Sequence, residues 1–170
     1  GMLFCKVFGF SFTVLRYSTL VLAWIGGIGT YFLSREFSDN KGACLFTALL
    51  LLLNPIYLNL SNTFMTDVPF TSLLVLSLLF FVKGLRQDRW TYIVQGVIFI
   101  MIATLIRQLG LLAAAAFSMA ILIKAGLSKR SFLISALAIG VPLGAYLLYN
   151  HWLGNQHIYP VKYDEGFRRI

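Results

Sequence analysis

The amino-acid sequence predicts an all-α membrane protein, a polytopic bundle of about six transmembrane helices. Of its 170 residues, 59% are hydrophobic and 12% are charged, and the mean hydropathy is +0.82. A soluble domain carries about 25% charged residues. The hydrophobic residues also gather in runs of membrane-spanning length, separated by short polar turns. These runs are too many and too long for a signal peptide followed by a globular domain.

The net charge of +8 does not indicate a nucleic-acid partner. The basic residues lie in the short turns between apolar runs, where the positive-inside rule and anionic lipid headgroups account for them. The cysteines, Cys5 and Cys44, are far apart and give neither a metal-ligand spacing nor a convincing disulfide. Composition therefore indicates a membrane as the environment of this chain.

Two spans are predicted in the first third of the chain, after an apolar segment (1–14) that we interpret as an interfacial helix or the end of a truncated element. The first span covers residues 15–33, and its central glycines allow another helix to approach closely. These glycines are Gly26, Gly27 and Gly29. The second span covers residues 42–60. Asn54-Pro55 interrupts it and predicts a kink, because proline removes a backbone donor.

Four further spans are predicted after residue 67. The third covers residues 68–82, and the sixth covers 132–149. The region 90–123 would be about 50 Å long as one helix, too long for a ~30 Å hydrocarbon core. It must therefore turn back, and Arg107-Gln108 is its only polar break. Residues 1–150 form the predicted bundle, and residues 151–170 form a polar tail or the start of a further region.

A polar stretch at residues 61–69 separates the second and third spans and contains a lone acid, Asp67. A carboxylate between two membrane-length segments is energetically costly and therefore indicates a specific role. One interpretation is a helix cap, with Thr66 or Asp67 at the N-cap and Pro69 in the first turn. The other is a site at the mouth of a membrane-surface cavity. The two interpretations are compatible.

The distribution of basic residues predicts which ends of the spans share a membrane face. Three turns rich in Lys and Arg alternate with turns that lack this enrichment, so the positive-inside rule places the basic turns in the cytoplasm. Six spans then leave both chain ends extracytoplasmic. The same topology brings Asp67, Arg107, Gln108 and the tail from Asn150 to the extracytoplasmic face.

Arg107 has three interpretations at this stage. Its side chain can extend to the lipid headgroups from the end of an apolar span. It can form a structural ion pair with Asp67. Its planar guanidinium can also bind a phosphate group. Chemistry alone does not choose among them, although an ionisable residue inside a membrane segment is by default a functional-site hypothesis.

Several short motifs resemble those of the bacterial C-type-fold (GT-C) membrane glycosyltransferases. They are Gly9-x-Ser11-x-x-x-Leu15-Arg16, Asn54-Pro55, Ser61 through Thr66-Asp67-Val68-Pro69, and Ile106-Arg107-Gln108-x-Gly110. The similarity covers roughly residues 7–150 and is strongest in the order and spacing of the motifs. The group includes the protein O-mannosyltransferases and the lipid A aminoarabinose transferases.

The resemblance implies a glycosyltransferase that moves a sugar from a polyprenyl-phosphate donor to a lipid, glycan or protein acceptor at the extracytoplasmic face. Asp67 would then be a supporting catalytic residue, and the substrate-binding residues would be Thr66, Arg107 and Gln108. A divalent metal ion is the one candidate cofactor. Because these motifs resemble those of bacterial members of the group, the resemblance implies that the protein lies in the bacterial plasma membrane.

The sequence departs from that family pattern in two places. Family members begin with one more span and a first outer loop that carries the catalytic acid, and no residue here matches that acid. The last segment offers Glu165-Gly166-Phe167-Arg168-Arg169 where the aminoarabinose branch has Glu-His followed by Arg-Phe. We therefore expect an incomplete transferase, with a non-catalytic assembly subunit and a small-solute transporter as alternatives. His151, His157, Asp164 and Glu165 are further residues that can join the site.

Overall fold

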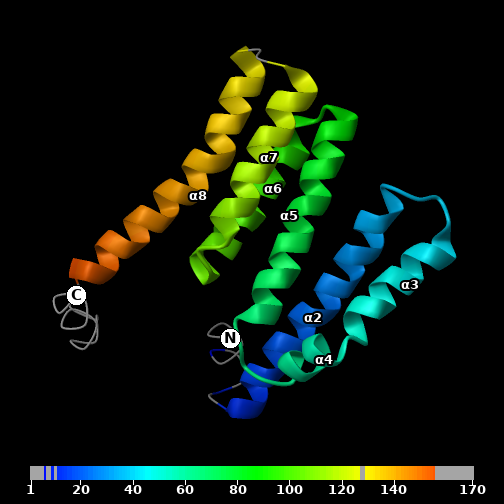
Figure 1. Ribbon diagram of the computed structural model, residues 1–170. Helices are drawn as coiled ribbons and strands as arrows, with labels where there is room; N and C mark the ends of the chain where they lie inside the picture. Colours follow the sequence, from blue (N-terminus) through cyan, green and yellow to red (C-terminus); the bar gives the residue numbers. More distant parts are fainter. Residues whose placement is uncertain (1–5, 7–8, 10, 127–128, 156–170) are drawn as a thin grey trace, which may run out of the picture.

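The computed structural model describes residue 6, residue 9, residues 11–126 and residues 129–155 of the chain. This described part is all-α and contains seven helices (Figure 1). They are α2 (Phe12–Arg35), α3 (Lys41–Leu52), α4 (Pro55–Ser61), α5 (Asp67–Gln87), α6 (Trp90–Ile106), α7 (Gly110–Ala125) and α8 (Lys129–Asn155). The all-α prediction is confirmed.

Three of these helices, α2, α5 and α8, are long and apolar enough to cross a membrane. The α3–α4 pair adds a fourth candidate if its two helices count as one broken span. The other two, α6 and α7, are apolar but have only 17 and 16 residues, about 25 Å at 1.5 Å per residue. The helices are those of a multi-pass membrane protein, whereas six complete spans remain a prediction.

The predicted interruption at Asn54-Pro55 is a full break between two helices. The axes of α3 and α4 differ by 60°. Pro55 occupies the first turn of α4, where its missing N–H costs nothing. The Asn54 side chain accepts hydrogen bonds from the backbone N–H groups of Ile56 (3.0 Å) and Tyr57 (3.2 Å). Asn54 therefore caps a new helix instead of sitting inside a kinked one.

The second half of the bundle packs around aromatic rings and close helix contacts. Phe81 of α5 is 2% exposed, and its ring stacks on that of Phe117 with centroids 3.5 Å apart. A Cβ on Gly96 of α6 would run into the Phe81 ring, so only glycine allows this approach. Buried serines add hydrogen bonds between helices. Ser77 donates to the Gly96 carbonyl at 3.0 Å.

The predicted turn between the fourth and fifth segments is present. Helix α6 ends at Ile106 and α7 begins at Gly110, so Arg107 and Gln108 lie in the loop between two antiparallel helices (Figure 1). A Cβ on Gly110 would lie 2.5–2.8 Å from atoms of Thr104. Glycine at this position therefore permits the tight reversal.

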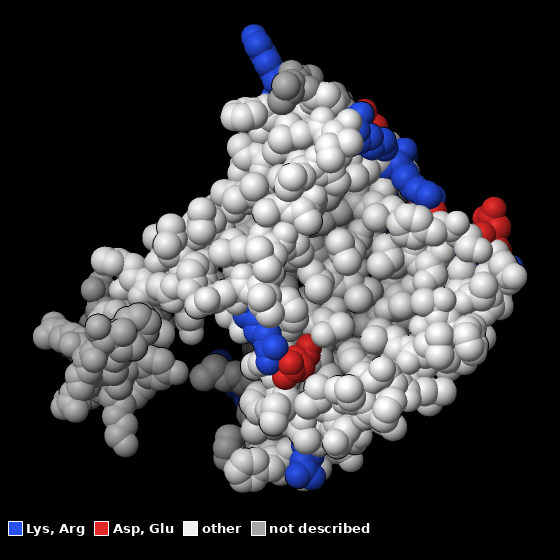
Figure 2. All heavy atoms as spheres, viewed as in Figure 1, with Lys and Arg blue, Asp and Glu red and all other residues white. Residues whose placement is uncertain are grey.

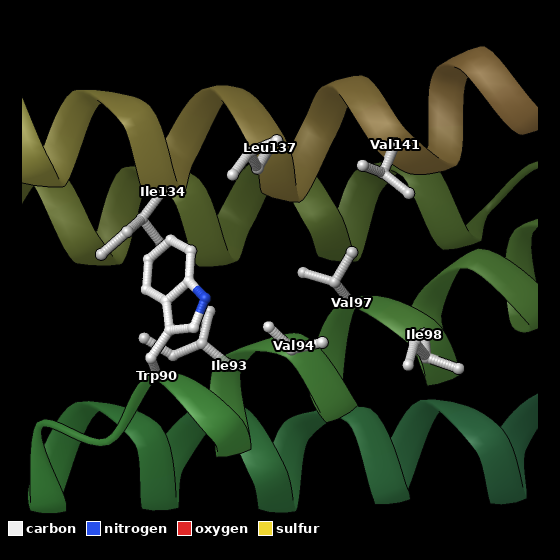
Figure 3. Close-up of a pocket in the computed structure, with 8 residues that line it drawn as sticks. All are labelled: Trp90, Ile93, Val94, Val97, Ile98, Ile134, Leu137 and Val141. Atoms are coloured by element: carbon white, nitrogen blue, oxygen red, sulfur yellow. The ribbon is translucent and has the colours of Figure 1, made fainter.

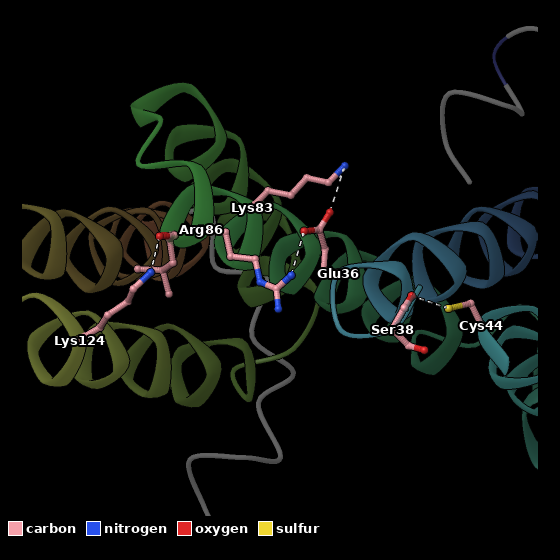
Figure 4. A network of polar contacts seen from close by, with 7 residues as sticks. Glu36, Ser38, Cys44, Lys83, Arg86 and Lys124 are labelled. Atoms are coloured by element: carbon pink, nitrogen blue, oxygen red, sulfur yellow. Dashed lines mark hydrogen bonds and ion pairs between the residues drawn. The ribbon is translucent and has the colours of Figure 1, made fainter. Parts of the chain in front are cut away.

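Charged residues gather at one end of the bundle, where the α2–α3, α5–α6 and α7–α8 connections lie (Figures 1 and 2). Glu36 at the end of α2 contacts Lys83 at 3.9 Å and Arg86 at 3.8 Å, both on α5 (Figure 4). Lys124 of α7 donates to the Leu85 carbonyl in the last turn of α5. The basic turns therefore share one end, as the topology predicts. Which membrane side that end faces stays a prediction.

The last helix, α8, runs through Pro142 and continues to Asn155. Its first part packs against α6 and α7, and Ser118 and Ser135 donate to each other's backbone carbonyls at 3.1 and 3.2 Å. The first residues of the predicted tail, from His151, are therefore helical. The remainder of the tail lies outside the described residues.

Candidate functional site

The candidate site lies where the α4–α5 loop meets the α6–α7 loop, at the end of the bundle opposite the basic turns (Figure 1). Helix α5 begins here with Asp67, preceded by Thr66 at the N-cap position. Thr66 has helical backbone angles and its side chain makes no capping hydrogen bond. The cap interpretation is therefore confirmed in position, with Thr66 at the N-cap and Pro69 in the first turn, although the Thr66 side chain makes no capping hydrogen bond.

Asp67 is the only acidic residue in the first turn of α5. The backbone N–H groups at a helix N-terminus carry partial positive charge, which favours a carboxylate there. Thr71, one turn later, donates its hydroxyl hydrogen to the Asp67 carbonyl at 2.8 Å. The Asp67 backbone is therefore held in helical geometry while its side chain is about one-third exposed (34%).

Arg107 connects the two loops. Its backbone is extended, at φ −144° and ψ 133°, and its N–H donates to the Ala103 carbonyl at 2.9 Å. Its side chain reaches across to α5, where Nη2 lies 2.8 Å from Asp67 Oδ1. Nε donates to the Thr66 hydroxyl at 3.3 Å. Three residues that the sequence singled out are thus in direct contact, although Thr66 and Arg107 are 41 positions apart.

The ion pair between Arg107 and Asp67 is partly exposed to solvent. The side chains of Arg107 and Asp67 are 36% and 34% exposed. Ion pairs of such exposure contribute about 0–1 kcal/mol to stability, because water screens the attraction. Arginine carries five N–H donors, and the described contacts use Nε and one hydrogen of Nη2. Among the described residues, Nη1 has no hydrogen-bond or ion-pair partner.

Gln108 connects the same loop to the last helix. Its Nε2 donates to the hydroxyl of Tyr146 on α8 at 2.5 Å. The α6–α7 loop is therefore tied to α5 through Arg107 and to α8 through Gln108. Sequence reasoning missed Tyr146. The predicted topology places it near the same membrane face, but one tyrosine near the end of an apolar span gives no specific signal.

The observed contacts of Arg107 distinguish among its three interpretations. The ion pair with Asp67 is present, whereas an arginine extended freely to the headgroups would not hold two partners on α5. Binding of phosphate by Arg107 is compatible with the ion pair and stays a prediction. Further candidates differ in position. His151 lies on α8 and is exposed, whereas His157, Asp164 and Glu165 lie outside the described residues.

The described residues do not provide a metal centre. They contain no group of three or more His, Cys, Asp or Glu side chains that could hold an ion. Asp67 is the carboxylate at this end of the described bundle, and a cation already pairs with it. The donor set in this part of the chain therefore does not fit a divalent metal, and the predicted cofactor stays untested.

A separate apolar pocket lies between α6 and α8, with a volume of about 340 Å³. The Trp90 ring extends between the two helices at one end of it (Figure 3). The lining residues are all hydrophobic: Trp90, Ile93, Val94, Val97, Ile98, Ile134, Leu137 and Val141. None of the predicted site residues lines this pocket.

Comparison with known proteins adds one match. The family model described as dolichyl-phosphate-mannose-protein mannosyltransferase matches residues 2–159. No curated protein and no solved structure matches the chain. The matched segment includes the Asp67–Arg107 pair, Gln108 and Tyr146.

Proposed function

The chain belongs to the dolichyl-phosphate-mannose-protein mannosyltransferase family, and we propose that it transfers a sugar from a polyprenyl-phosphate donor to an acceptor at the extracytoplasmic membrane face. The family is one of transferases that use lipid-linked sugars. The choice of acceptor among lipid, glycan and protein, and the bacterial plasma membrane as its location, are part of this proposal.

One observation carries the proposal: Asp67 and Thr66 at the start of α5 hold the Arg107 guanidinium, and Nη1 has no partner among the described residues. Sugar transfer from a lipid phosphate develops negative charge on the departing phosphate, and a fixed cation stabilises that charge without reorganising. Arginine suits this role because its planar fork matches phosphate oxygens. We assign Arg107 to the donor phosphate and Gln108 to a neighbouring polar contact.

Asp67 has a supporting role in this scheme. Its carboxylate contacts Arg107 directly, so it orients the guanidinium and is not free to serve as the principal general base. The scheme assigns deprotonation of the acceptor to none of the described residues. No step of the scheme passes through a metal ion.

The experiment is transfer from a polyprenyl-phosphate sugar by the natural full-length protein, reconstituted in lipid vesicles, with Arg107→Gln as the variant. We expect transfer to fall about 100-fold, because one preorganised charge-stabilising group is lost. Arg107→Lys should recover part of the activity, because it keeps the charge but not the fork. Arg86→Gln is the matched control. Arg86 is a half-exposed arginine paired with Glu36 at the opposite end.

The outcomes separate the proposal from its rivals. Equal transfer by wild type and a folded Arg107→Gln variant would refute the phosphate assignment. Loss of the folded protein in this variant would instead favour the assembly-subunit alternative, in which the Asp67–Arg107 pair is structural. Solute uptake into vesicles that depends on Arg107, without sugar transfer, would favour the transporter.

A further inference from the structure

We propose that Tyr57 is a positioning residue for the candidate site: its buried hydroxyl clamps α4 between α2 and α5 and thereby sets the place of Thr66 and Asp67. The inference rests on the proposed function for its catalytic consequence. Its structural content stands on contacts that the proposed function does not use.

Tyr57 is 8% exposed, and its hydroxyl lies among polar groups of two other helices. Its oxygen is 3.2 Å from Ser72 Oγ on α5 and 3.4 Å from the Ala23 carbonyl on α2. Ser72, fully buried, donates its own hydrogen to the Val68 carbonyl at 2.8 Å. Either hydroxyl can donate in the contact between Tyr57 and Ser72, and the Tyr57 hydroxyl also lies within hydrogen-bond distance of the Ala23 carbonyl, so α2, α4 and α5 meet at the Tyr57 oxygen.

Glycine makes this meeting possible. A Cβ on Gly26 of α2 would lie 2.5 Å from Ser72 Oγ and 2.8 Å from the Tyr57 oxygen. A larger residue at this position would therefore displace the Tyr57 or Ser72 hydroxyl from its present place. The predicted role of the α2 glycines in close helix approach is thereby confirmed for Gly26, and the polar atoms it admits are now identified.

The Tyr57–Ser72–Ala23 contact lies close to the site loop along both α4 and α5. Tyr57 belongs to a short helix of seven residues, which leads through residues 62–66 directly into Asp67. On α5, Ser72 bonds to the carbonyl of Val68, the residue after Asp67. The clamp therefore fixes both the segment before Thr66 and the first turn after it. Arg107 then meets two partners whose positions are already set.

Removing the hydroxyl should loosen α4 without opening a cavity. Tyr57→Phe keeps the ring and leaves the hydrogen bond of Ser72 to Val68 intact. The α4–α5 loop can then shift relative to Arg107, and a displacement of about 1 Å at a reacting centre costs up to about 100-fold in rate. Ser72→Ala removes the acceptor on the other side of the same contact and serves as the second variant.

Ser77→Ala is the matched control. Ser77 is a fully buried α5 serine that donates to another helix, at Gly96, just as Ser72 lies at a contact between helices. It faces α6, away from the α4 contact. Its loss should lower thermal stability to a similar extent as Ser72→Ala while leaving the site loop in place.

The first measurement is independent of activity. Spin labels at Met65 and Leu109, both exposed, report the distance between the two loops by electron paramagnetic resonance in the full chain in vesicles, with the native cysteines replaced by alanine. We expect the distance distribution to shift or broaden in Tyr57→Phe and in Ser72→Ala, but not in Ser77→Ala. An unchanged distribution in both clamp variants would overturn the inference.

The second measurement is a double-mutant cycle on sugar transfer. If Tyr57 acts through Asp67, Tyr57→Phe should lower transfer at least tenfold in the wild-type background and clearly less in an Asp67→Asn background. If Tyr57→Phe lowers sugar transfer by the same factor with Asp67 and with Asn at position 67, the positioning role is overturned. If the wild type transfers no sugar while the loop distance still responds to Tyr57→Phe, the proposed function fails and the clamp remains.

Discussion

At the scale of single residues, small side chains set how closely the helices of this bundle approach one another. Gly96 meets the Phe81 ring, and Gly26 meets the hydroxyls of Tyr57 and Ser72. At some other glycines of the bundle an added Cβ would meet no neighbouring atom. A Cβ on Gly140 of α8 would contact nothing within 4 Å. The same residue type is therefore essential for packing at some helical positions and replaceable at others.

Gly96→Ala tests this difference. The added methyl group collides with Phe81, which is held against Phe117, so we expect a loss of about 1–3 kcal/mol in stability, measured as thermal or denaturant unfolding in detergent. Gly140→Ala is the control and should be neutral or stabilising, because alanine has the higher helix propensity. Equal stability of the two variants would contradict the packing argument.

The sequence singled out Asp67 and Arg107, which the structure brings into contact, but it did not indicate the tyrosines that hold the neighbouring segments. Asp67 and Arg107 stood out because ionisable groups are rare in apolar segments, and that signal is local. Tyr57 and Tyr146 gave no such signal. Their importance comes from contacts across 15 to 38 positions, which depend on how the helices pack. No local pattern around a tyrosine encodes that packing.

At the scale of elements, the broken α3–α4 pair is the feature that positions the site loop. The sequence correctly marked Asn54-Pro55 but favoured a simple kink within one span. Proline alone explains a kink. The full break arises because Asn54 also supplies an N-cap, so that α4 starts with satisfied N–H groups and a 60° change of direction.

Asn54→Ala should therefore weaken α4 while Pro55 keeps the break. We expect a loss of about 1 kcal/mol, typical for removal of an N-cap side chain, together with lower sugar transfer because α4 leads into Thr66. Asn40→Ala is the control, since Asn40 caps α3 in the same way at the opposite end of the bundle. Unfolding and transfer assays on both variants decide the matter. A similar effect of both on transfer would contradict the link between α4 and the site.

At the scale of the whole molecule, charge is divided between the two ends. One end carries the basic turns with Glu36, and the other, where α4 leads into α5, carries the Asp67–Arg107 contact. Figure 2 shows Lys and Arg gathered along one edge of the molecule. The alternation of turns predicted this division, because each crossing of the bundle reverses the end reached. The number of complete spans was less predictable. Run lengths in the sequence do not show where a helix ends. Helices α6 and α7 have 17 and 16 residues, which is fewer than the ~20 residues of a typical membrane span.

The orientation of the bundle in the membrane can be tested with two single-cysteine variants, Met65→Cys and Asn40→Cys, in a protein whose native cysteines are replaced. Each variant is labelled in intact cells. An impermeant maleimide should label position 65 directly and position 40 only after the membrane is permeabilised, because the positive-inside rule predicts that the basic end faces the cytoplasm. The reverse pattern would show that the bundle is inverted. It would also move the proposed transfer to the cytoplasmic face.

The short α6–α7 pair has a consequence for the lipid around it. When these helices cross a ~30 Å hydrocarbon core, their length of about 25 Å leaves a hydrophobic mismatch of about 5 Å that the bilayer relieves by thinning. The loop joining them contains Arg107, so a patch thinned in this way would border the guanidinium. Lipid phosphates there would lie deeper than elsewhere in the same leaflet. The membrane itself would then bring a lipid-borne phosphate to the depth of the arginine.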